Sequence, residues 1–247
     1  MSEPREEEGR GVRLQVYMAR CGVGSRRRCE EIIASCAVAV NGKRVTTQGT
    51  RVAPGDVVTW NGRKLSPVRR LLYIALNKPR QYLCANHDDQ GRPLAIDLLK
   101  GAVTTRLFHV GRLDFLSTGL ILYTNDGEFA RIVAHPSSRV PKEYLVDTVQ
   151  PLSDEQLERY RRGVRGEKGQ YRLVSWKRID ARRVVLVLEE GRNREIREVL
   201  RLFGVQARRV HRIRIGPVSV KGLAAGQFRH LRPREVAWFL RLGSDRS

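Results

Sequence analysis

Apolar residues recur at helical spacing in two stretches near the N-terminus. In the first stretch they are Leu14, Tyr17, Met18 and Cys21. In the second they are Cys29, Ile32, Ile33 and Cys36, so that the cysteines are expected to be small core residues. Gly22-Val23-Gly24 separates the two stretches, and Ser25 offers a side-chain oxygen that can cap the second helix. The pattern predicts two short helices joined by a glycine-rich turn.

Short alternating segments follow these helices. Val38 and Val40 alternate with a smaller residue, and Asn41-Gly42 is a typical two-residue hairpin turn before the chain returns. A second Asn-Gly pair, Asn61-Gly62, follows the apolar segment 56–60. We therefore expect a small independent module over residues 11–66, with residues 67–70 as a linker.

The remaining residues, 71–247, mix strand and helix patterns without a regular βαβ period. The expected strands are Leu71–Leu76, Leu107–Leu113, Leu120–Tyr123, Glu143–Val149 and Val184–Leu188. The expected helices are Gly127–His135, a helix opened by Pro151-Leu152-Ser153, and one that Asn193 caps and Gly204 closes. Such an order favours an α+β domain with a mixed, largely antiparallel sheet.

Composition adds an electrostatic argument. Lys plus Arg is 47 and Asp plus Glu is 26, which gives a net charge of +21, while 41% of the residues are hydrophobic. The chain can bury a core, and a charge surplus of this size is typical of proteins that meet a polyanion. Nucleic acid and an anionic membrane surface are the two candidates, and we expect nucleic acid and no membrane partner. No apolar run reaches the roughly 18 residues of a spanning helix.

The N-terminus and the cysteines indicate a compartment. The first ten residues, MSEPREEEGR, are acidic and polar, so they resemble neither a signal peptide nor a transit peptide, and we expect residues 1–10 to be a disordered tail. The four cysteines form no CxxC pair. The sequence therefore predicts a reduced, cytoplasmic protein.

Three arginines begin the second helix. Arg26, Arg27 and Arg28 fall on its first turn, where each cation opposes the helix dipole by about 0.3–1 kcal/mol. Residues 11–70 carry 12 basic and 3 acidic side chains. We expect these arginines to contact phosphate groups, and an ordinary solvated surface is the alternative.

The common catalytic fingerprints are absent from the sequence. It contains no P-loop, no GxGxxG after a strand, no GxSxG and no HExxH. The five histidines are scattered without acidic or cysteine neighbours at ligand spacing, so we expect no metal site.

One acidic residue stands out. Asp114 ends the segment Gly111-Arg112-Leu113-Asp114, where a predicted strand leaves the sheet, and a Ser/Thr/Gly loop follows it. Leu113, Phe115 and Leu116 surround it with apolar side chains, so its ionised form needs a cation partner. A turn residue that makes local hydrogen bonds is the alternative interpretation.

The N-terminal module resembles the S4 RNA-binding domain. The resemblance lies in residues 22–27, 38–43 and 52–58. The family usually has a glycine and basic residues between the second helix and its strand, where this chain has Cys36, Ala37 and Ala39. This departure predicts a weaker RNA affinity for the module than is typical of the family.

The second part resembles the ribosomal pseudouridine synthases, in the group that contains the small-subunit enzyme A and the large-subunit enzyme B. Gly111–Asp114 and Gly119–Glu128 carry this resemblance. Other segments agree in order, namely Leu76–Pro79, Lys142–Tyr144, Glu190–Arg197 and Arg212–Gly216. The resemblance extends from about Val12 to Pro233, and an S4 module before such a catalytic domain is typical of the group.

The resemblance implies roles for single residues. Asp114 matches the catalytic aspartate, Tyr144 the tyrosine that stacks on the target base and serves in proton transfer at C5, and Arg197 the cation that holds the aspartate ionised. Ile215 matches the apolar wall under the uracil ring. The residues expected to bind RNA phosphates are Arg26, Arg27, Arg28, Lys43, Arg112, Arg192, Arg194 and Arg212.

Two departures accompany these roles. Gln81 stands where a glycine is frequent, and Glu198 where an arginine is common. The isomerisation involves neither redox change nor phosphoryl transfer, so it is expected to need no cofactor and no metal.

The segment Glu190–Arg197 is most similar to that of large-subunit enzyme B, which favours 23S ribosomal RNA as substrate. The small-subunit 16S RNA and a non-catalytic S4-type assembly factor stay open as alternatives. A nuclease or glycosidase is less favoured, because paired carboxylates or a metal-ligand set would be expected. Ribosomal RNA or a pre-ribosomal particle is the expected partner, and a monomer the expected form.

Overall fold

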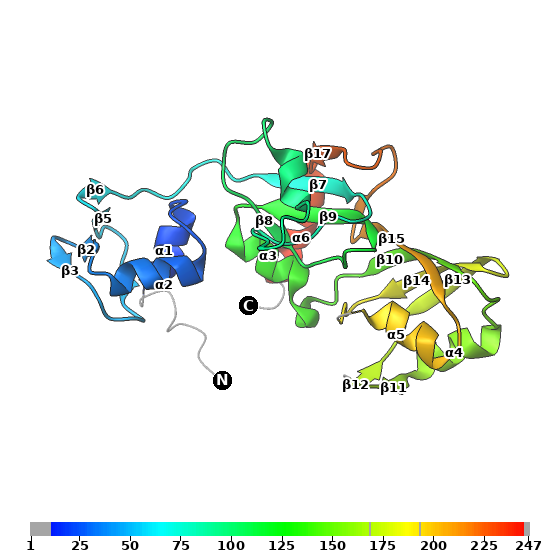
Figure 1. The fold of residues 1–247 in the computed structure, drawn as a ribbon. Coiled ribbons are helices and arrows are strands. Elements are labelled where there is room, and N and C mark those ends of the chain that lie inside the picture. Colours follow the sequence, from blue (N-terminus) through cyan, green and yellow to red (C-terminus); the bar gives the residue numbers. More distant parts are fainter. Residues whose placement is uncertain (1–10, 168, 193, 245–247) are drawn as a thin grey trace. The chain divides into compact units, whose positions relative to one another are not determined.

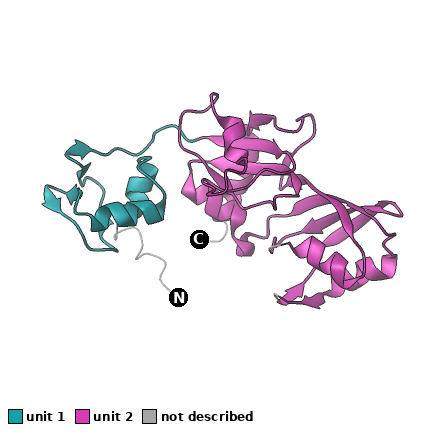
Figure 2. Cartoon of the chain, in the orientation of Figure 1, with its two compact units in different colours: residues 1–71 teal, residues 72–247 magenta. Residues whose placement is uncertain are grey.

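The computed structural model describes residues 11–167, 169–192 and 194–244. It divides into two compact units, one ending at Leu71 and the other beginning at Leu72 (Figure 2). The predicted disordered tail, residues 1–10, lies outside the described residues. We keep 11–66 and 71–247 as the proposed domains, with 67–70 as the proposed linker.

The first unit contains two helices and short strands (Figure 1). The helices are α1 (Leu14–Arg20) and α2 (Arg26–Ala34). The strands are β1 (Val12–Arg13), β2 (Val38–Val40), β3 (Lys43–Arg44), β4 (Arg51–Val52), β5 (Val58–Trp60) and β6 (Arg63–Lys64). Strands β3-β2-β5-β6 form an antiparallel sheet, and β1 pairs with β4.

Local signals in the sequence account for these elements. The Ser25 hydroxyl accepts a hydrogen bond from the Arg28 backbone N–H at 3.1 Å and so caps α2. Both Asn-Gly pairs have positive φ at each residue, as a type I′ hairpin turn requires. The core of the unit is built from Leu14, Met18, Cys29, Ile32, Ile33, Val38, Val52 and Val58.

The predicted role of one cysteine is wrong. Helix α2 ends at Ala34, and Cys36 has φ +63° and an exposed side chain, so it is not part of the buried stripe. The chain turns in the left-handed region at this point to reach β2. Cys21 is only partly buried, whereas Cys29 is buried as expected.

The second unit has a nine-stranded sheet and four α-helices in its described residues (Figure 1). The helices are α3 (Gly127–Ala134), α4 (Asp154–Arg162), α5 (Glu195–Leu202) and α6 (Pro233–Ser244), with short 3₁₀ helices at Ala95–Leu99 and Pro136–Ser138. The sheet strands are β7 (Tyr73–Lys78), β8 (Phe108–Val110), β9 (Thr118–Thr124), β10 (Lys142–Thr148), β13 (Ser175–Asp180), β14 (Arg183–Leu188), β15 (Ala207–Ile215), β16 (Val218–Ser219) and β17 (Phe228–His230). A separate hairpin joins β11 (Val164–Gly166) and β12 (Gly169–Tyr171).

The sheet is mixed and mostly antiparallel. Its strand order is β13-β14-β10-β15-β9-β7-β17, with β8 paired to β9 and β16 to β15. Within the described part of this sheet, the one parallel pairing is between β9 and β15, and it joins only His211 to Thr118 and Arg212 to Gly119. The predicted α+β class with a largely antiparallel sheet is therefore confirmed.

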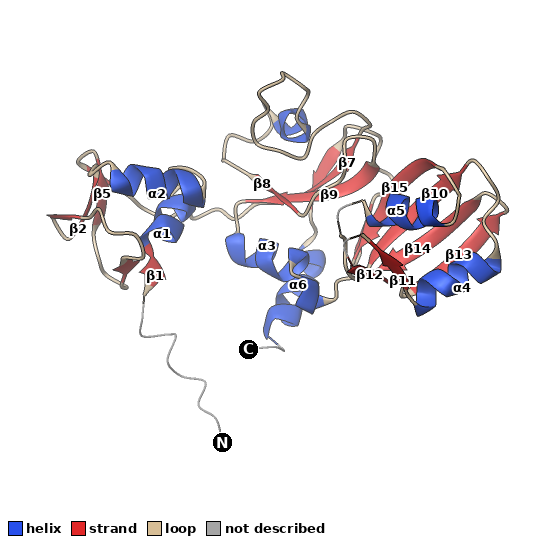
Figure 3. Cartoon of the chain, turned by 60° about the horizontal axis from the view of Figure 1, so that its bottom comes forward, coloured by secondary structure: helices blue, strands red, loops and turns tan. Residues whose placement is uncertain are grey.

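Apolar side chains cover both faces of the sheet. Along β9, Ile121 and Tyr123 belong to one core, while Leu120 and Leu122 belong to another. Helices α4 and α5 contribute to the first core, and α3 and α6 pack together on the second (Figure 3). Because both faces are buried, β9 has a continuous apolar sequence rather than an alternating one.

Several predicted bounds shift, and some elements were not predicted. Leu107–Leu113 contains only the three-residue strand β8, because the chain turns at Gly111, which has φ +69°. Strands β13 and β15 and helix α6 were missed, because charged residues interrupt their apolar patterns. The predicted cap Asn193 lies outside the described residues, and α5 begins at Glu195. In the described part of the chain, every helix is too short or too polar to cross a bilayer.

The parallel β9–β15 pairing requires a glycine. Gly119 has φ +103°, and a Cβ at this position would overlap the backbone nitrogen and carbonyl oxygen of Arg212. Any other residue would force the two strands apart and also strain its own backbone.

We expect Gly119→Ala to lower the free energy of unfolding by at least about 3 kcal/mol, because strain and overlap add. Gly101→Ala is the matched control, since Gly101 also has a positive φ but open space around it. Its cost is expected to be about 1–2 kcal/mol, from backbone strain alone. Urea unfolding of the full-length variants measures both values, and equal losses would contradict the overlap.

Candidate active site

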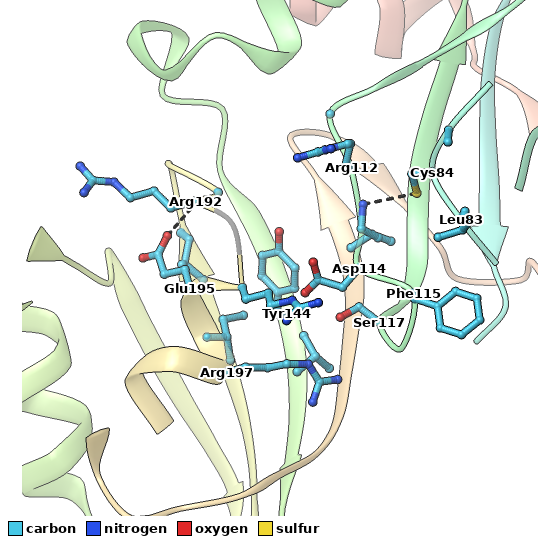
Figure 4. Close-up of a pocket in the computed structure, with 18 of the residues that line it drawn as sticks. Leu83, Cys84, Arg112, Asp114, Phe115, Ser117, Tyr144, Arg192, Glu195 and Arg197 are labelled. Carbon is cyan, nitrogen blue, oxygen red and sulfur yellow. Dashed lines mark hydrogen bonds between the residues drawn. The ribbon is translucent and has the colours of Figure 1, made fainter. Parts of the chain in front are cut away.

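A cavity of about 640 Å³ lies in the second unit and brings the three predicted catalytic residues together (Figure 4). Asp114 follows β8, Tyr144 lies in β10 and Arg197 lies in α5, so three separate elements supply them. We call this space the Asp114 cavity.

The loop that carries Asp114 is held by backbone contacts. The Ser117 N–H donates to the Asp114 carbonyl at 3.0 Å, and the Gln81 N–H donates to the Phe115 carbonyl at 2.8 Å. The Leu113 N–H donates to the buried Cys84 Sγ at 3.4 Å. The loop is thus fixed on both sides of Asp114 without any use of its carboxylate.

The Asp114 carboxylate itself is directed into the cavity. Figure 4 shows it turned toward the ring of Tyr144. Among the described residues, it accepts no hydrogen bond and makes no ion pair within 4 Å. A turn residue would use its carboxylate locally, so this geometry favours a carboxylate that is kept available for a ligand.

Tyr144 is fixed by the strands on its two sides. It lies opposite Leu186 of β14 and Arg212 of β15, and its side chain is 8% exposed. The Arg212 Nη1 donates to the Tyr144 hydroxyl at 3.4 Å, and the guanidinium lies 5.9 Å from the ring centroid. One arginine therefore orients both the ring and the hydroxyl of Tyr144.

Arg197 contributes positive charge without a bonded partner in the cavity. Burial lowers the pKa of its guanidinium, and the nearby Asp114 carboxylate opposes this shift. Its Nη1 donates to the Ala207 carbonyl at 3.3 Å, while its Nε is buried without a hydrogen bond among the described residues. Arg197 and Asp114 interact electrostatically, but within the described residues they form no direct ion pair.

Comparison with known proteins identifies the kind of protein that carries this cavity. The family model for RNA pseudouridylate synthase matches residues 72–202, and that for the S4 domain matches residues 12–58. The chain belongs to the RNA pseudouridylate synthase family. This enzyme therefore joins an S4 domain to a pseudouridine synthase domain, as the sequence predicted.

Individual relatives agree with this assignment. The chain is 39% identical to an uncharacterized RNA pseudouridine synthase of Borreliella burgdorferi, over 87% of this chain and 88% of that protein. It is 37% identical to the ribosomal large subunit pseudouridine synthase B of Bacillus subtilis, over 91% of this chain and 93% of that protein. A crystal structure of a pseudouridylate synthase superposes with a TM-score of 0.69 at 26% identity, over 93% of this chain and all of the other.

Arg212 lies elsewhere in this pseudouridine synthase than the sequence predicted. We expected it to contact RNA phosphate, but its side chain is only 3% exposed. Its Nε donates to the Leu120 carbonyl at 2.7 Å, and its Nη2 is buried with no partner among the described residues. Its guanidinium is enclosed by β9 and Tyr144 and lines a cavity, so it supports Tyr144 from within the sheet and is not part of the exposed surface.

Ile215 lies at a second, adjoining cavity of about 430 Å³. This Arg212 cavity shares Arg112 and Tyr144 with the Asp114 cavity, and its lining also includes Lys142. Burial lowers the pKa of Lys142 to about 8, and its Nζ donates to the Val140 and Glu189 carbonyls. Ile215, the predicted apolar wall, thus lines the Arg212 cavity and not the Asp114 cavity, while Tyr144 lines both.

The other predicted RNA-binding residues are all exposed. Arg112, Arg192 and Arg194 lie at the rim of the Asp114 cavity, and Arg192 pairs with Glu190 at 2.8 Å. The four in the first unit are Arg26, Arg27, Arg28 and Lys43, of which Arg28 pairs with Glu31. In the described chain, no group of three metal-ligating side chains was found.

Lys78 is a buried residue that interacts electrostatically with Asp114 and that the sequence analysis did not single out. It is fully buried, and its Nζ donates to the Pro79 and Tyr82 carbonyls at 2.9 Å each. Burial lowers its pKa to about 8, although the Cys84 thiol and the Asp114 carboxylate oppose the shift. Its position after an apolar strand gave no signal of burial, because a lysine at a strand end is normally solvated.

The lowered pKa of Lys78 predicts a pH-dependent stability. Between about pH 8 and its ordinary value of 10.5, this amine binds fewer protons in the folded than in the unfolded chain. The burial penalty is therefore fully present below pH 8 and is relieved as the pH rises. The neutral amine still has hydrogens for both carbonyl groups.

We therefore expect Lys78→Met to cost more free energy of unfolding at about pH 9.5 than at about pH 7. Lys221→Met, at an exposed lysine, is the control, and its cost in free energy of unfolding should be the same at both pH values. Urea unfolding of the two variants and the wild type at each pH measures this. A Lys78→Met cost that stays constant would show that Lys78 titrates like a solvated lysine.

Proposed function

We propose that this enzyme isomerises a specific uridine to pseudouridine in ribosomal RNA, preferably 23S, with Asp114 as the nucleophile. The observation that carries the proposal is the Asp114 carboxylate, which has no bonded partner among the described residues and lies in one cavity with Tyr144 and Arg197. The preference for 23S RNA rests on the segment Glu190–Arg197 and on the large-subunit name of the Bacillus subtilis relative.

The reaction sets clear demands on the site. The uracil is detached from ribose C1′ at nitrogen, turns within the site and is rejoined through C5. The carboxylate acts by adding to the sugar, by adding to the base or by assisting a glycal, and each route needs a free oxygen next to the nucleotide. A carboxylate already bonded to a protein cation would first have to break that bond.

Tyr144 and Arg197 act beside the nucleophile in this proposal. The Tyr144 ring stacks on the target base, and its hydroxyl, held by Arg212, serves in proton transfer at C5. Arg197 supplies positive charge beside the partly buried Asp114 carboxylate and interacts with it electrostatically. The Arg212 cavity, with Ile215 in its wall, gives the detached base room to turn.

The target uridine must leave its stack before it enters the site. Flipping a base costs a few kcal/mol, which phosphate contacts can offset. Exposed arginines at the rim are suited to this, namely Arg112, Arg192 and Arg194. In the S4 unit, Arg26, Arg27, Arg28 and Lys43 are proposed to bind further phosphates. The expected partner is ribosomal RNA or a pre-ribosomal particle in the cytoplasm, with the enzyme as a monomer.

The substrate class is tested with wild-type enzyme on unmodified 23S and 16S transcripts, followed by chemical mapping of pseudouridine. Pseudouridine at a defined position of the 23S transcript alone supports the proposal. Modification of the 16S transcript alone would transfer the assignment to the small subunit. No modification of either transcript, together with activity on another RNA, would contradict a ribosomal substrate.

We expect Asp114→Asn to abolish isomerisation while RNA affinity stays within a few fold of the wild type. The amide keeps the shape of the side chain but cannot act as a nucleophile. Asp89→Asn is the control, because Asp89 is exposed and the change in charge is the same. Turnover by Asp114→Asn above a no-enzyme blank would refute the nucleophile assignment.

The S4 arginines are tested separately. If Arg26 and Arg27 each contact a phosphate, Arg26→Gln/Arg27→Gln should reduce the slope of log affinity against log salt by about 1.4–1.8 units. Arg161→Gln/Arg201→Gln is the charge-matched control, since both arginines are paired with glutamates on exposed helix surfaces. Titration of a 23S transcript at several salt concentrations measures the slopes, and equal slopes for the two double variants would exclude these contacts.

A further inference from the structure

A third hollow in the second unit has a strongly basic lining. It measures about 800 Å³, and we call it the Arg208 groove. Its lining includes Arg80, Arg182, Arg183, Arg208 and Arg209. None of these residues was among those predicted to bind RNA.

Most of this charge has no partner within the protein. Arg183 pairs with Asp147 at 2.6 Å. The side chains of the other four arginines make no hydrogen bond or ion pair with any described residue, and all four are exposed. With Asp147 and Asp180 as the acidic groups in the lining, five positive charges face two negative ones. Such a concentration of like charge is typical of a surface that binds an anion.

The Arg208 groove lies directly beside the Asp114 cavity. Phe115 lines the cavity and the next residue, Leu116, lines the groove. On β15, Val210 lines the cavity while Arg208 and Arg209 line the groove. The two hollows are therefore separated by one turn of the 114–117 loop and by adjacent residues of one strand.

An electrostatic interaction and an exposed apolar side chain also link the Arg208 groove to the Asp114 cavity. Arg80, in the lining of the groove, is close enough to Arg197 to help lower the pKa of that guanidinium, after burial itself. Leu116 is 44% exposed at the boundary between the hollows. An apolar side chain in this place can pack against a ribose or a base of a nucleotide next to the one in the cavity.

We propose that the Arg208 groove binds backbone phosphates of the RNA strand that flanks the target uridine. This inference rests on the proposed function, because it places the target in the Asp114 cavity. A strand that leaves the cavity passes Leu116 and then meets Arg80, Arg182, Arg208 and Arg209. Guanidinium groups suit this partner, since each can offer two parallel N–H donors to one phosphate.

The main test compares two variants of the full-length enzyme with equal change in charge. Arg208→Gln/Arg209→Gln removes two groove charges, and Arg161→Gln/Arg201→Gln removes two charges elsewhere. Binding of a 23S transcript is titrated at several salt concentrations. The groove variant should lower the slope of log affinity against log salt by about 1.4 units, at roughly 0.7 per single-strand phosphate contact, and the control should leave it unchanged.

A second groove variant distinguishes the loss of phosphate contacts from a folding defect in β15. Arg80→Gln/Arg182→Gln changes two residues outside β15 and should give the same reduction in slope. Wild-type slopes for both groove variants would overturn the proposal. An equal reduction in the groove variants and the control would also overturn it, because the effect would then follow net charge alone and not the groove.

Fragments of the RNA locate the contact and separate it from the proposed function. Once the modified uridine is mapped, RNAs are cut next to it on the 5′ or the 3′ side. Wild type and groove variant should become equal in affinity when one particular side is removed and stay different when the other is removed. A difference that survives both cuts would overturn the flanking-strand placement.

The proposed function can fail independently of the groove. Binding slopes require no turnover, so absent isomerisation by the wild type would refute the function and leave the slope comparison valid. Conversely, normal turnover of saturating RNA by a groove variant with an unchanged slope would refute the groove alone. If RNA binding is unaffected but an acidic protein segment binds to the wild type and not to the variant, the groove serves a protein partner and the RNA proposal is wrong.

Discussion

The buried guanidinium of Arg212 is the interaction on which the second unit depends most. It bonds to the Leu120 carbonyl of β9 and to the Tyr144 hydroxyl of β10, so one side chain connects three neighbouring strands through the middle of the sheet. A buried cation is costly unless its donors are used, and one of its nitrogens has no partner in the described chain. The strands are tied together at the expense of an electrostatic cost that a bound ligand's oxygen atom can reduce.

Buried positive charge is concentrated around the site. Lys78 and Lys142 both have pKa values of about 8 because burial disfavours their charged forms. Both amines donate to backbone carbonyls, so they hold the chain next to the cavities in place. A substrate with negative charge close to the reacting base therefore meets a field that the protein has set before binding.

The sequence predicted those features that follow from local pattern, and it missed those set by long-range packing. The Ser25 cap and the apolar strand β9 were recognisable because their signals lie within a few residues. Strand β15 was missed and Arg212 was assigned to the surface, because arginines are solvated in most sequences and only the partners from β9 and β10 make this one internal. Asp114 was found through its motif, whereas the lack of a hydrogen-bond partner for its carboxylate among the described residues is visible only in three dimensions.

The short contact between β9 and β15 has a mechanical consequence. Asp114 follows a strand that pairs with β9, while Tyr144 lies on a strand that pairs with β15, and those two halves share only two residue pairs in parallel register. Because the two halves of the sheet meet at so few residue pairs, a small change in the angle between them displaces the strands farthest from this joint the most. Asp114 and Tyr144 both lie close to this joint, so such a change displaces them less than it displaces the outer strands.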